Sequence, residues 1–490
     1  MTVATSPTTA ARPEAIGSTR RGVIPAIVVG EVVCVVLGSL FFGPFAAAAA
    51  ALALAFFLLA YRSPTWAWML VWFVIPFDME QVVGGGMAVT IPTEPMILLA
   101  LAAWAARGLV GGSWKVPPTR IHLPLVLLGA WTLASTLWSV SPVSTLKAWV
   151  MMSGYVLFGY LFVVSSEGSS AGRERWLRLV AIMGAAWGAF GIAKVVFFGG
   201  GGQNLVSIAS TYSFGAFRPF FSEHGTFAAY IAMLLPPALI ATLEYGGARR
   251  LFFGVSAALM IAAIVLAFAR AAWLSMLLVL PPTVILWALW RREARRLVWP
   301  AVLVGAILLL VLTLGIGRQI TKHATTASSA QNISNLERLN RWRTAIMMTQ
   351  SRPVTGVGFG CFVVGYAAYR SKALPTDQTY VRMGVHSEPL KLLSENGIPG
   401  FLLAVWLVVT VTAVAFRVFR HAPDPRDRAV ALAVWAGLAT YVANGFFNAY
   451  LAETKVTVPF WAAIGVIGAL ERRLPGDVPR PAPPRARPAP

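Results

Sequence analysis

Apolar runs of up to about twenty residues follow one another along most of the chain, and polar residues gather between them. A helix needs roughly 20 apolar residues to cross the hydrocarbon core of a bilayer, because each residue adds about 1.5 Å of length. Fourteen runs meet or approach this length, so the sequence predicts an all-α fold, a polytopic membrane helix bundle of about 12–14 transmembrane helices. The predicted spans are 23–42, 45–61, 64–77, 95–110, 123–140, 146–164, 176–199, 225–244, 251–269, 271–290, 298–316, 398–416, 429–448 and 455–470.

Two of these runs need separate treatment. The run 64–77 is short and contains Pro76, which favours a re-entrant or interfacial piece. Residues 251–290 form one apolar stretch that only Arg270 interrupts. As a single helix this stretch would be about 60 Å long, roughly twice the thickness of the core. Two spans joined by a tight turn at Arg270 are therefore expected.

The composition, with 57% hydrophobic and 12% charged residues, favours one membrane domain over several soluble domains. A net charge of +21 could indicate nucleic-acid binding, but the basic residues lie in short loops between apolar runs. If the N-terminus is cytoplasmic, the alternate loops on that side hold 25 of the 40 Lys and Arg residues, as the positive-inside rule requires. We therefore expect cytoplasmic N- and C-termini, a lipid bilayer as partner and no nucleic acid.

Other local features complete this topology. The first apolar run has no convincing small-residue cleavage site after it, so it is expected to be a retained span. Cys34 and Cys361 are too few for a disulfide framework and are expected to be packing residues. The expected parts are a cytoplasmic tail (1–22), eleven spans (23–316), a large outer loop (317–397), three spans (398–470) and a disordered Pro/Arg-rich cytoplasmic tail (471–490).

The outer loop carries ten Lys and Arg residues against four acids. After a polar hinge at 321–334, a first loop helix places Arg338 and Arg341 on one face, with Glu337 and Arg341 as an i,i+4 pair. These residues could form an ordinary solvated face with an internal salt bridge. They could also form an anion clamp, because guanidinium donors match phosphate oxygens.

Three further features of the sequence bear on chemistry. Arg270, at membrane depth, costs at least about 2.5 kcal/mol, so it is either a functional residue or a snorkelling one. The glycine turn 356–360 lacks the Lys-Ser/Thr of a nucleotide loop and favours close backbone packing. His386 precedes a second loop helix that Ser387 can cap, that tolerates Pro389 in its first turn and that ends at Gly397. A lone histidine of this kind is more often structural than catalytic.

The ordered set of these motifs resembles the signature of the O-antigen ligase and Wzy-type polysaccharide polymerase superfamily. The motifs are an Arg-rich helix, Pro353, GVGFG at 356–360, HSEPL at 386–390 and ENGIPG at 395–400. The resemblance covers roughly residues 205–465. It implies a GT-C-like integral glycosyltransferase in the bacterial inner membrane, with its active site on the periplasmic face.

The resemblance implies a catalytic role for His386 and a diphosphate-binding role for Arg338 and Arg341. The context of Arg270 is similar to a Ser-Arg-small-small-Trp-Leu element of the family, with Ala269 in place of the serine. Arg218 is similar to an arginine that precedes a turn and a span, and it is expected to bind the diphosphate together with Arg270. The turn at 222–225 departs from the Pro-Asn turn usual in the family, and His224 is equally explained as a helix start.

The implied reaction transfers an undecaprenyl-diphosphate-linked oligosaccharide to a sugar acceptor, without metal or other cofactor. In a polymerase of O-antigen, capsule or exopolysaccharide the acceptor is another lipid-linked glycan, and in a ligase it is the lipid A core of lipopolysaccharide. We favour the polymerase, because fourteen spans exceed the dozen associated with ligases. A chain-length regulator and a flippase are the protein partners that such a pathway would add. The alternative from another class is a transporter or flippase for lipid-linked sugars, against which the lack of an evident internal repeat counts.

Overall fold

The computed structural model describes most of the membrane domain and part of the outer loop. The described residues are 44–83, 87–111, 116–166, 168–198, 221, 223–267, 269–291, 299, 330–370, 384–451 and 453–475. The predicted spans 23–42 and 298–316, the predicted tail 1–22, residues 476–490 of the predicted tail 471–490, Cys34 and Arg218 lie outside them. Each of the other twelve predicted runs is helical over most of its described residues.

Helices account for nearly all of the regular structure. They are α2 (Pro44–Arg62), α3 (Pro64–Val74), α4 (Thr93–Gly111), α5 (His122–Ala134), α6 (Pro142–Val156), α7 (Phe162–Ser166), α8 (Ser170–Phe198), α10 (His224–Glu244), α11 (Gly247–Leu266), α12 (Arg270–Trp290), α14 (Ala330–Ser351), α15 (Phe362–Tyr369), α16 (Glu388–His421), α17 (Pro425–Gly445) and α18 (Thr454–Glu471). Short helical pieces lie at Ile75–Phe77, Ser135–Leu137 and Leu157–Leu161. In the described part of the chain, seven helices are long and apolar enough to cross a membrane, which confirms a polytopic helical membrane fold.

The chain divides into two compact units. In the first unit, described at 44–68 and 98–111, the Arg107 guanidinium donates to the carbonyl oxygens of Tyr61 and Arg62 over 3.4 and 3.2 Å, and so ties α4 to the end of α2. The second unit, described from 69 to 97 and from 116 to 475 with the gaps given above, contains the candidate site.

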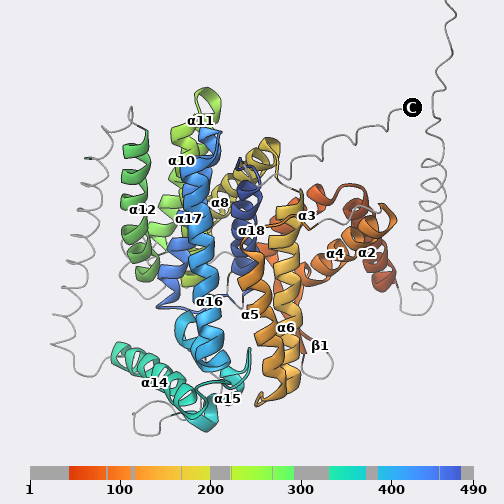
Figure 1. The fold of residues 1–490 in the computed structure, drawn as a ribbon, viewed down its shortest axis with the longest axis vertical. Coiled ribbons are helices and arrows are strands. Elements are labelled where there is room, and N and C mark those ends of the chain that lie inside the picture. Colours follow the sequence, from red (N-terminus) through yellow and green to blue (C-terminus); the bar gives the residue numbers. More distant parts are fainter. Residues whose placement is uncertain are drawn as a thin grey trace, which may run out of the picture. The chain divides into compact units, whose positions relative to one another are not determined.

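Helix α10 is the most enclosed candidate span of the second unit. Its span is 83% buried, against 28% for α12, and it packs against α8, α11, α12, α17 and α18. A Cβ atom at Gly437 of α17 would lie 2.3 Å from the Met233 carbonyl oxygen, so only glycine permits this close approach. Figure 1 shows α10, α16 and α17 running alongside one another, with α14 and α15 at one end of the unit next to the first turns of α16.

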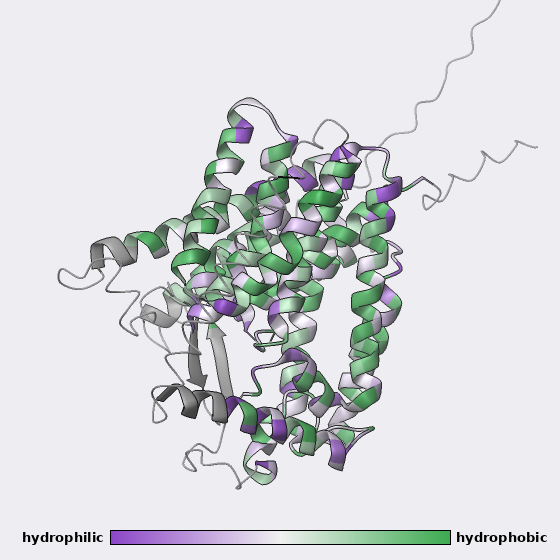
Figure 2. Ribbon diagram, turned by 90° about the vertical axis from the view of Figure 1, so that its left-hand side faces the viewer, coloured by the Kyte–Doolittle hydropathy of each residue, from purple (hydrophilic) through white to green (hydrophobic). Residues whose placement is uncertain are grey.

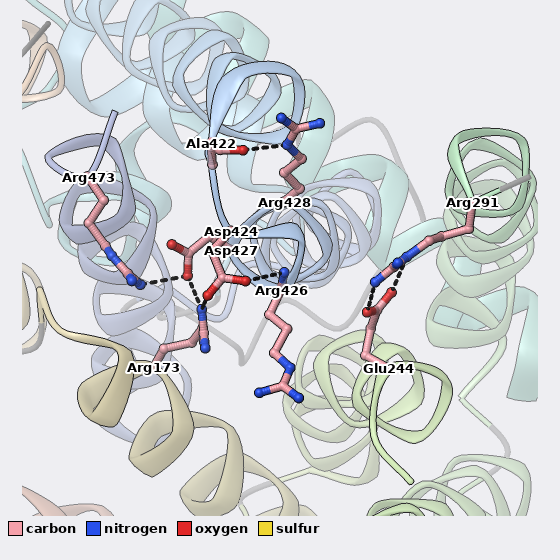
Figure 3. Close-up of polar contacts among 9 residues, drawn as sticks. All are labelled: Arg173, Glu244, Arg291, Ala422, Asp424, Arg426, Asp427, Arg428 and Arg473. Atoms are coloured by element: carbon pink, nitrogen blue, oxygen red, sulfur yellow. Dashed lines mark hydrogen bonds and ion pairs between the residues drawn. The ribbon is translucent and has the colours of Figure 1, made fainter. Parts of the chain in front are cut away.

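Hydrophilic residues gather mainly toward the helix ends, while the middles of the helices are mostly hydrophobic (Figure 2). At the end remote from α14, Arg173 of α8 forms ion pairs with Asp424 (2.6 Å) and Asp427 of α17, and Arg473 reaches Asp427 over 2.7 Å (Figure 3). Nearby, Glu244 at the end of α10 pairs with Arg291 (Figure 3). All of these residues come from segments predicted to share the cytoplasmic side, and the fold brings them together. The compartment that they face stays a prediction.

Two predictions from the sequence are confirmed here. Helix α11 ends at Leu266 and α12 begins at Arg270, which confirms the turn between two spans. The run 64–77 is a short helix followed by a 3₁₀ turn that contains Pro76, and its re-entrant or interfacial position stays a prediction. Gly397, with φ of 66°, separates a short first part of α16 from its long second part, which confirms the predicted helix end.

Two features differ from the sequence analysis. Strands β1 (Met79–Val83) and β2 (Met87–Ile91) form an antiparallel hairpin in which Met79 pairs with Ile91. Valine, threonine and isoleucine around a glycine run suit such a hairpin, but the apolar-run criterion does not detect it. Helix α14 begins at Ala330, inside the predicted hinge 321–334, because alanine and glutamine extend the helix N-terminally.

Candidate functional site

Helix α14 presents the two predicted phosphate-binding arginines in different environments. Arg338 is exposed, whereas Arg341 is only 8% exposed. The carboxylate of Glu337 lies 3.5 Å from Arg341 Nη2, which confirms the i,i+4 pair. Among the described residues Arg341 Nε is buried without a hydrogen-bond partner. Because an unsatisfied buried donor costs about 1–3 kcal/mol, Arg341 is suited to receive an additional acceptor such as a phosphate oxygen.

His386 has an unusual backbone conformation. Its φ of 52° lies in the left-handed region, and no other non-glycine residue in the described part of the chain has a positive φ. A side chain in this region costs free energy, so the surrounding structure must hold it there. The imidazole is half-buried. Ser387 takes the predicted N-cap position of α16 without a side-chain cap bond, and Pro389 lies in the first turn as expected.

Glu388 anchors this segment to the loop between α17 and α18. Its carboxylate accepts hydrogen bonds from Leu451 N (2.6 Å) and Tyr441 Oη (3.4 Å). Its backbone N–H donates to the backbone carbonyl oxygen of Asn448 over 3.2 Å. Glu388 belongs to the HSEPL motif, but its sequence context predicts no role for it. In the structure it fixes the start of α16, and therefore the segment of His386, against that loop.

The glycine turn packs under the same helix. Gly356, Gly358 and Gly360 have φ values of 64°, 107° and 74°. The Glu395 carboxylate accepts from the backbone N of Gly360 (3.0 Å) and Phe362 (3.1 Å). A Cβ atom at Gly356 would lie 2.4 Å from the Glu395 carbonyl carbon. This confirms close backbone packing for the turn. Cys361, as predicted, is a buried packing residue.

The protonation of His386 depends first on its burial and then on the charges around it. Burial lowers the pKa of His386, Arg341 lowers it further, the Glu223 carboxylate opposes this effect, and Arg338 lowers it again. The imidazole is therefore neutral near pH 7 and able to accept a proton. The fold thus brings His386, Arg338 and Arg341 into one electrostatic environment.

Two residues of this environment were not predicted from the sequence as part of the site. Glu223 comes directly before α10, and Tyr450 lies in the loop between α17 and α18. Tyr450 is close enough to Gly225 that a Cβ atom there would lie 2.3 Å from Tyr450 Oη. The only sequence signal for Glu223 was its place beside His224, which is indeed the first residue of α10.

The other predicted residues are placed as follows. Arg270 is the exposed first residue of α12. Arg218 lies outside the described residues. Within the part that the structure describes, no group of three or more His, Cys, Asp or Glu residues could hold a metal ion, and metal independence stays a prediction.

The fold and the site define a polytopic helical membrane protein with a cationic, histidine-containing site at one end of its bundle. Residues 255–405 match the family model described as O-antigen ligase. The match runs from α11 into α16 and includes Arg270, α14, the glycine turn and His386. It confirms the resemblance to the O-antigen ligase and Wzy superfamily and supports a ligase or polymerase type of function in general. A comparison with curated proteins gives no match.

Proposed function

We propose that the chain is an inner-membrane glycosyltransferase that transfers an undecaprenyl-diphosphate-linked oligosaccharide to a sugar acceptor on the periplasmic side. The observation that carries the proposal is the half-buried His386, held at positive φ in the field of Arg341 and Arg338. The O-antigen ligase match over 255–405 supports the same reaction class.

In this proposal the neutral His386 imidazole takes the proton of the acceptor hydroxyl. The hydroxyl oxygen forms a bond to the anomeric carbon of the donor, and the bond from that carbon to the diphosphate oxygen breaks. The electron pair of the broken bond leaves with the lipid diphosphate. A lowered pKa suits this step because His386 is unprotonated before the reaction begins.

The arginines stabilise the charge that develops on the leaving diphosphate. Arg341 is buried, carries an unpartnered Nε and is already oriented, so it loses little entropy on binding. The exposed Arg338 adds a second positive charge on the same helix. Arg270 and Arg218 stay proposed contacts of the same diphosphate, and no metal or other cofactor is needed for this charge balance.

We favour a polymerase, whose acceptor is another lipid-linked glycan, on the number of apolar runs. A ligase that uses the lipid A core is the alternative. The same proposal includes cytoplasmic N- and C-termini. It also includes two protein partners, a chain-length regulator and a flippase.

The test is glycan transfer by purified protein in nanodiscs, with a lipid-linked oligosaccharide and EDTA but no nucleotide. We expect laddered product from the wild type. The variants His386→Ala and Arg341→Ala should each reduce the rate at least about 100-fold. Arg250→Ala, which removes an exposed charge at the start of α11, is the matched control and should retain activity.

Each other outcome has a defined meaning. A single addition to the lipid A core would replace the polymerase by the ligase. Full activity of His386→Ala would contradict the site. After reconstitution in closed vesicles, movement of lipid-linked sugar across the bilayer without transfer, by the wild type and His386→Ala alike, would favour the transporter.

A further inference from the structure

Glu223 occupies a helix start without serving as its cap. It holds the N-cap position of α10 in an extended conformation, and its side chain makes no cap hydrogen bond. The side chain is exposed. An N-cap carboxylate ordinarily accepts a hydrogen bond from the first turn of its helix, so this carboxylate is available for another role.

One loop connects the start of α10 to the histidine segment. Within residues 446–451, Tyr450 packs against Gly225, two residues after Glu223. The next residue, Leu451, donates its backbone N–H to Glu388, two residues after His386. The segment that carries Glu223 and the segment that carries His386 are therefore fastened to adjacent residues of the same loop. This arrangement brings the two segments to the same loop, although they are far apart in the sequence.

The charged groups that act on His386 come from two other elements. Arg341 and Arg338 belong to α14, and both disfavour the imidazolium. Glu223 from the start of α10 is the opposing negative charge, and it favours the protonated form of His386. The same carboxylate acts to raise the pKa of Arg341 and of Tyr450. On the segment of His386 itself, the Glu388 carboxylate is occupied by Leu451 N and Tyr441.

We infer that Glu223 is a positioning residue for His386, a carboxylate that stabilises the imidazolium formed when His386 takes the acceptor proton. This inference rests on the proposed function. Two arginines that bind the diphosphate would by themselves make His386 a weak base. A carboxylate at the start of α10 offsets part of this effect without neutralising Arg341 through direct pairing, since the partner of Arg341 is Glu337.

The first readout does not need activity. Diethyl pyrocarbonate modifies neutral imidazole, so the extent of modification of the His386 peptide against pH, measured by mass spectrometry, reports its pKa. In protein in nanodiscs we expect the midpoint to fall in Glu223→Gln and to stay near the wild-type value in Glu223→Asp. Glu223→Ser also removes the charge but supplies a favourable N-cap for α10. It should match Glu223→Gln, and agreement between the two variants shows that a damaged helix start does not cause the shift. Glu174→Gln removes a carboxylate near the start of α8 and is the control.

The second readout is the pH profile of glycan transfer. In Glu223→Gln the acid limb should move to lower pH and the plateau rate should fall about tenfold, because a weaker base removes less of the acceptor proton in the transition state. An unmoved His386 midpoint in both Glu223→Gln and Glu223→Ser would overturn the inference. Loss of all transfer with an unmoved midpoint would also overturn it, because Glu223 would then act directly on substrate. If the wild type transfers nothing but the midpoint still falls, the proposed function fails and the coupling of Glu223 to His386 remains.

Discussion

Glu395 illustrates how a single buried carboxylate organises the outer loop. It is 2% exposed and accepts hydrogen bonds from the backbone N–H groups of Gly360 and Phe362. The Gly360 N–H belongs to the glycine turn and the Phe362 N–H to the first turn of α15, so both need an acceptor from outside that helix. Glu395 therefore joins the end of the first part of α16 to the start of α15.

Replacing Glu395 by alanine should destabilise the protein by about 2–4 kcal/mol, because two buried N–H groups lose their acceptor. Thermal unfolding of purified protein in detergent measures the effect. Glu337→Ala is the control, since its partly exposed carboxylate forms a long 3.5 Å pair with Arg341. Equal losses in the two variants would contradict the role assigned to Glu395.

Asp78 is the second residue with a distinctive environment. Its Oδ1 accepts from Thr93 N over 3.1 Å, while its Oδ2 is buried without a partner in the described structure. Burial raises the pKa of Asp78 to about 6, although the Thr93 hydrogen bond and Lys455 oppose this effect. The folded protein therefore holds a proton on Asp78 that the unfolded chain, with an ordinary pKa of 3.8, releases earlier.

This difference predicts a pH dependence of stability. Below about pH 4 both states are protonated, and the contribution of the neutral carboxyl is fully present. As the pH rises toward 6 the unfolded state ionises first, so stability is lost across this window. Asp78→Asn keeps an acceptor for Thr93 and cannot ionise. Its unfolding temperature should rise relative to the wild type between pH 4 and pH 7, and parallel curves would contradict the prediction.

At the scale of elements, ion pairs join the helix ends at the Arg173 cluster, which consists of Arg173, Asp424, Asp427 and Arg473. Asp427 is 1% exposed and receives hydrogen bonds from Arg173 of α8 and from Arg473, which follows α18 (Figure 3). One carboxylate thus connects three helices. Removing one partner of a buried pair is costly because the remaining charge stays desolvated.

Asp427→Asn should lower the free energy of unfolding by about 3 kcal/mol, near the low end for buried pairs because Arg173 retains Asp424. Glu174→Gln gives the comparison, since Glu174 pairs with the exposed Arg178 and Arg249 and should change stability by less than about 1 kcal/mol. Unfolding monitored in the same detergent checks both values. A smaller loss for Asp427→Asn than for Glu174→Gln would contradict the difference between these pairs.

At the scale of the whole molecule, charge separates into two regions of the second unit. Arg338, Arg341 and His386 belong to one region, and the Arg173 cluster belongs to the other. The positive-inside rule predicts that the second region is cytoplasmic. The long outer loop can carry its arginines because loops of this length escape the rule.

This orientation can be tested with a membrane-impermeant thiol reagent in cells whose outer membrane is permeabilised. In a background with Cys34→Ala and Cys361→Ala, we expect Arg343→Cys on α14 to be labelled from outside. Arg250→Cys at the start of α11 should be labelled only after the inner membrane is disrupted. The reverse pattern would place the candidate site in the cytoplasm and contradict a periplasmic reaction.

The sequence by itself determined those features that depend on residues close together in the chain. Span length follows from runs of apolar residues, and the turn before Arg270 follows from a stretch too long for one span. The neighbourhood of Arg338 and Arg341 follows from helical spacing, and the break at Gly397 follows from local backbone preference. The turn before Arg270 and the break at Gly397 are confirmed because their physical causes act within one short stretch of the chain. The number of spans stays a prediction.

The tertiary structure alone decided which distant segments meet. The Glu388 carboxylate accepts a hydrogen bond from Leu451, 63 residues away. The Glu223 carboxylate influences the pKa of His386 across a still longer separation in the sequence. The burial of Arg341, the positive φ of His386 and the two hydrogen bonds of Glu395 also arise only after the loop packs against the bundle. Such contacts depend on the complementary fit of surfaces from separate helices, and no pattern within a single segment encodes that fit.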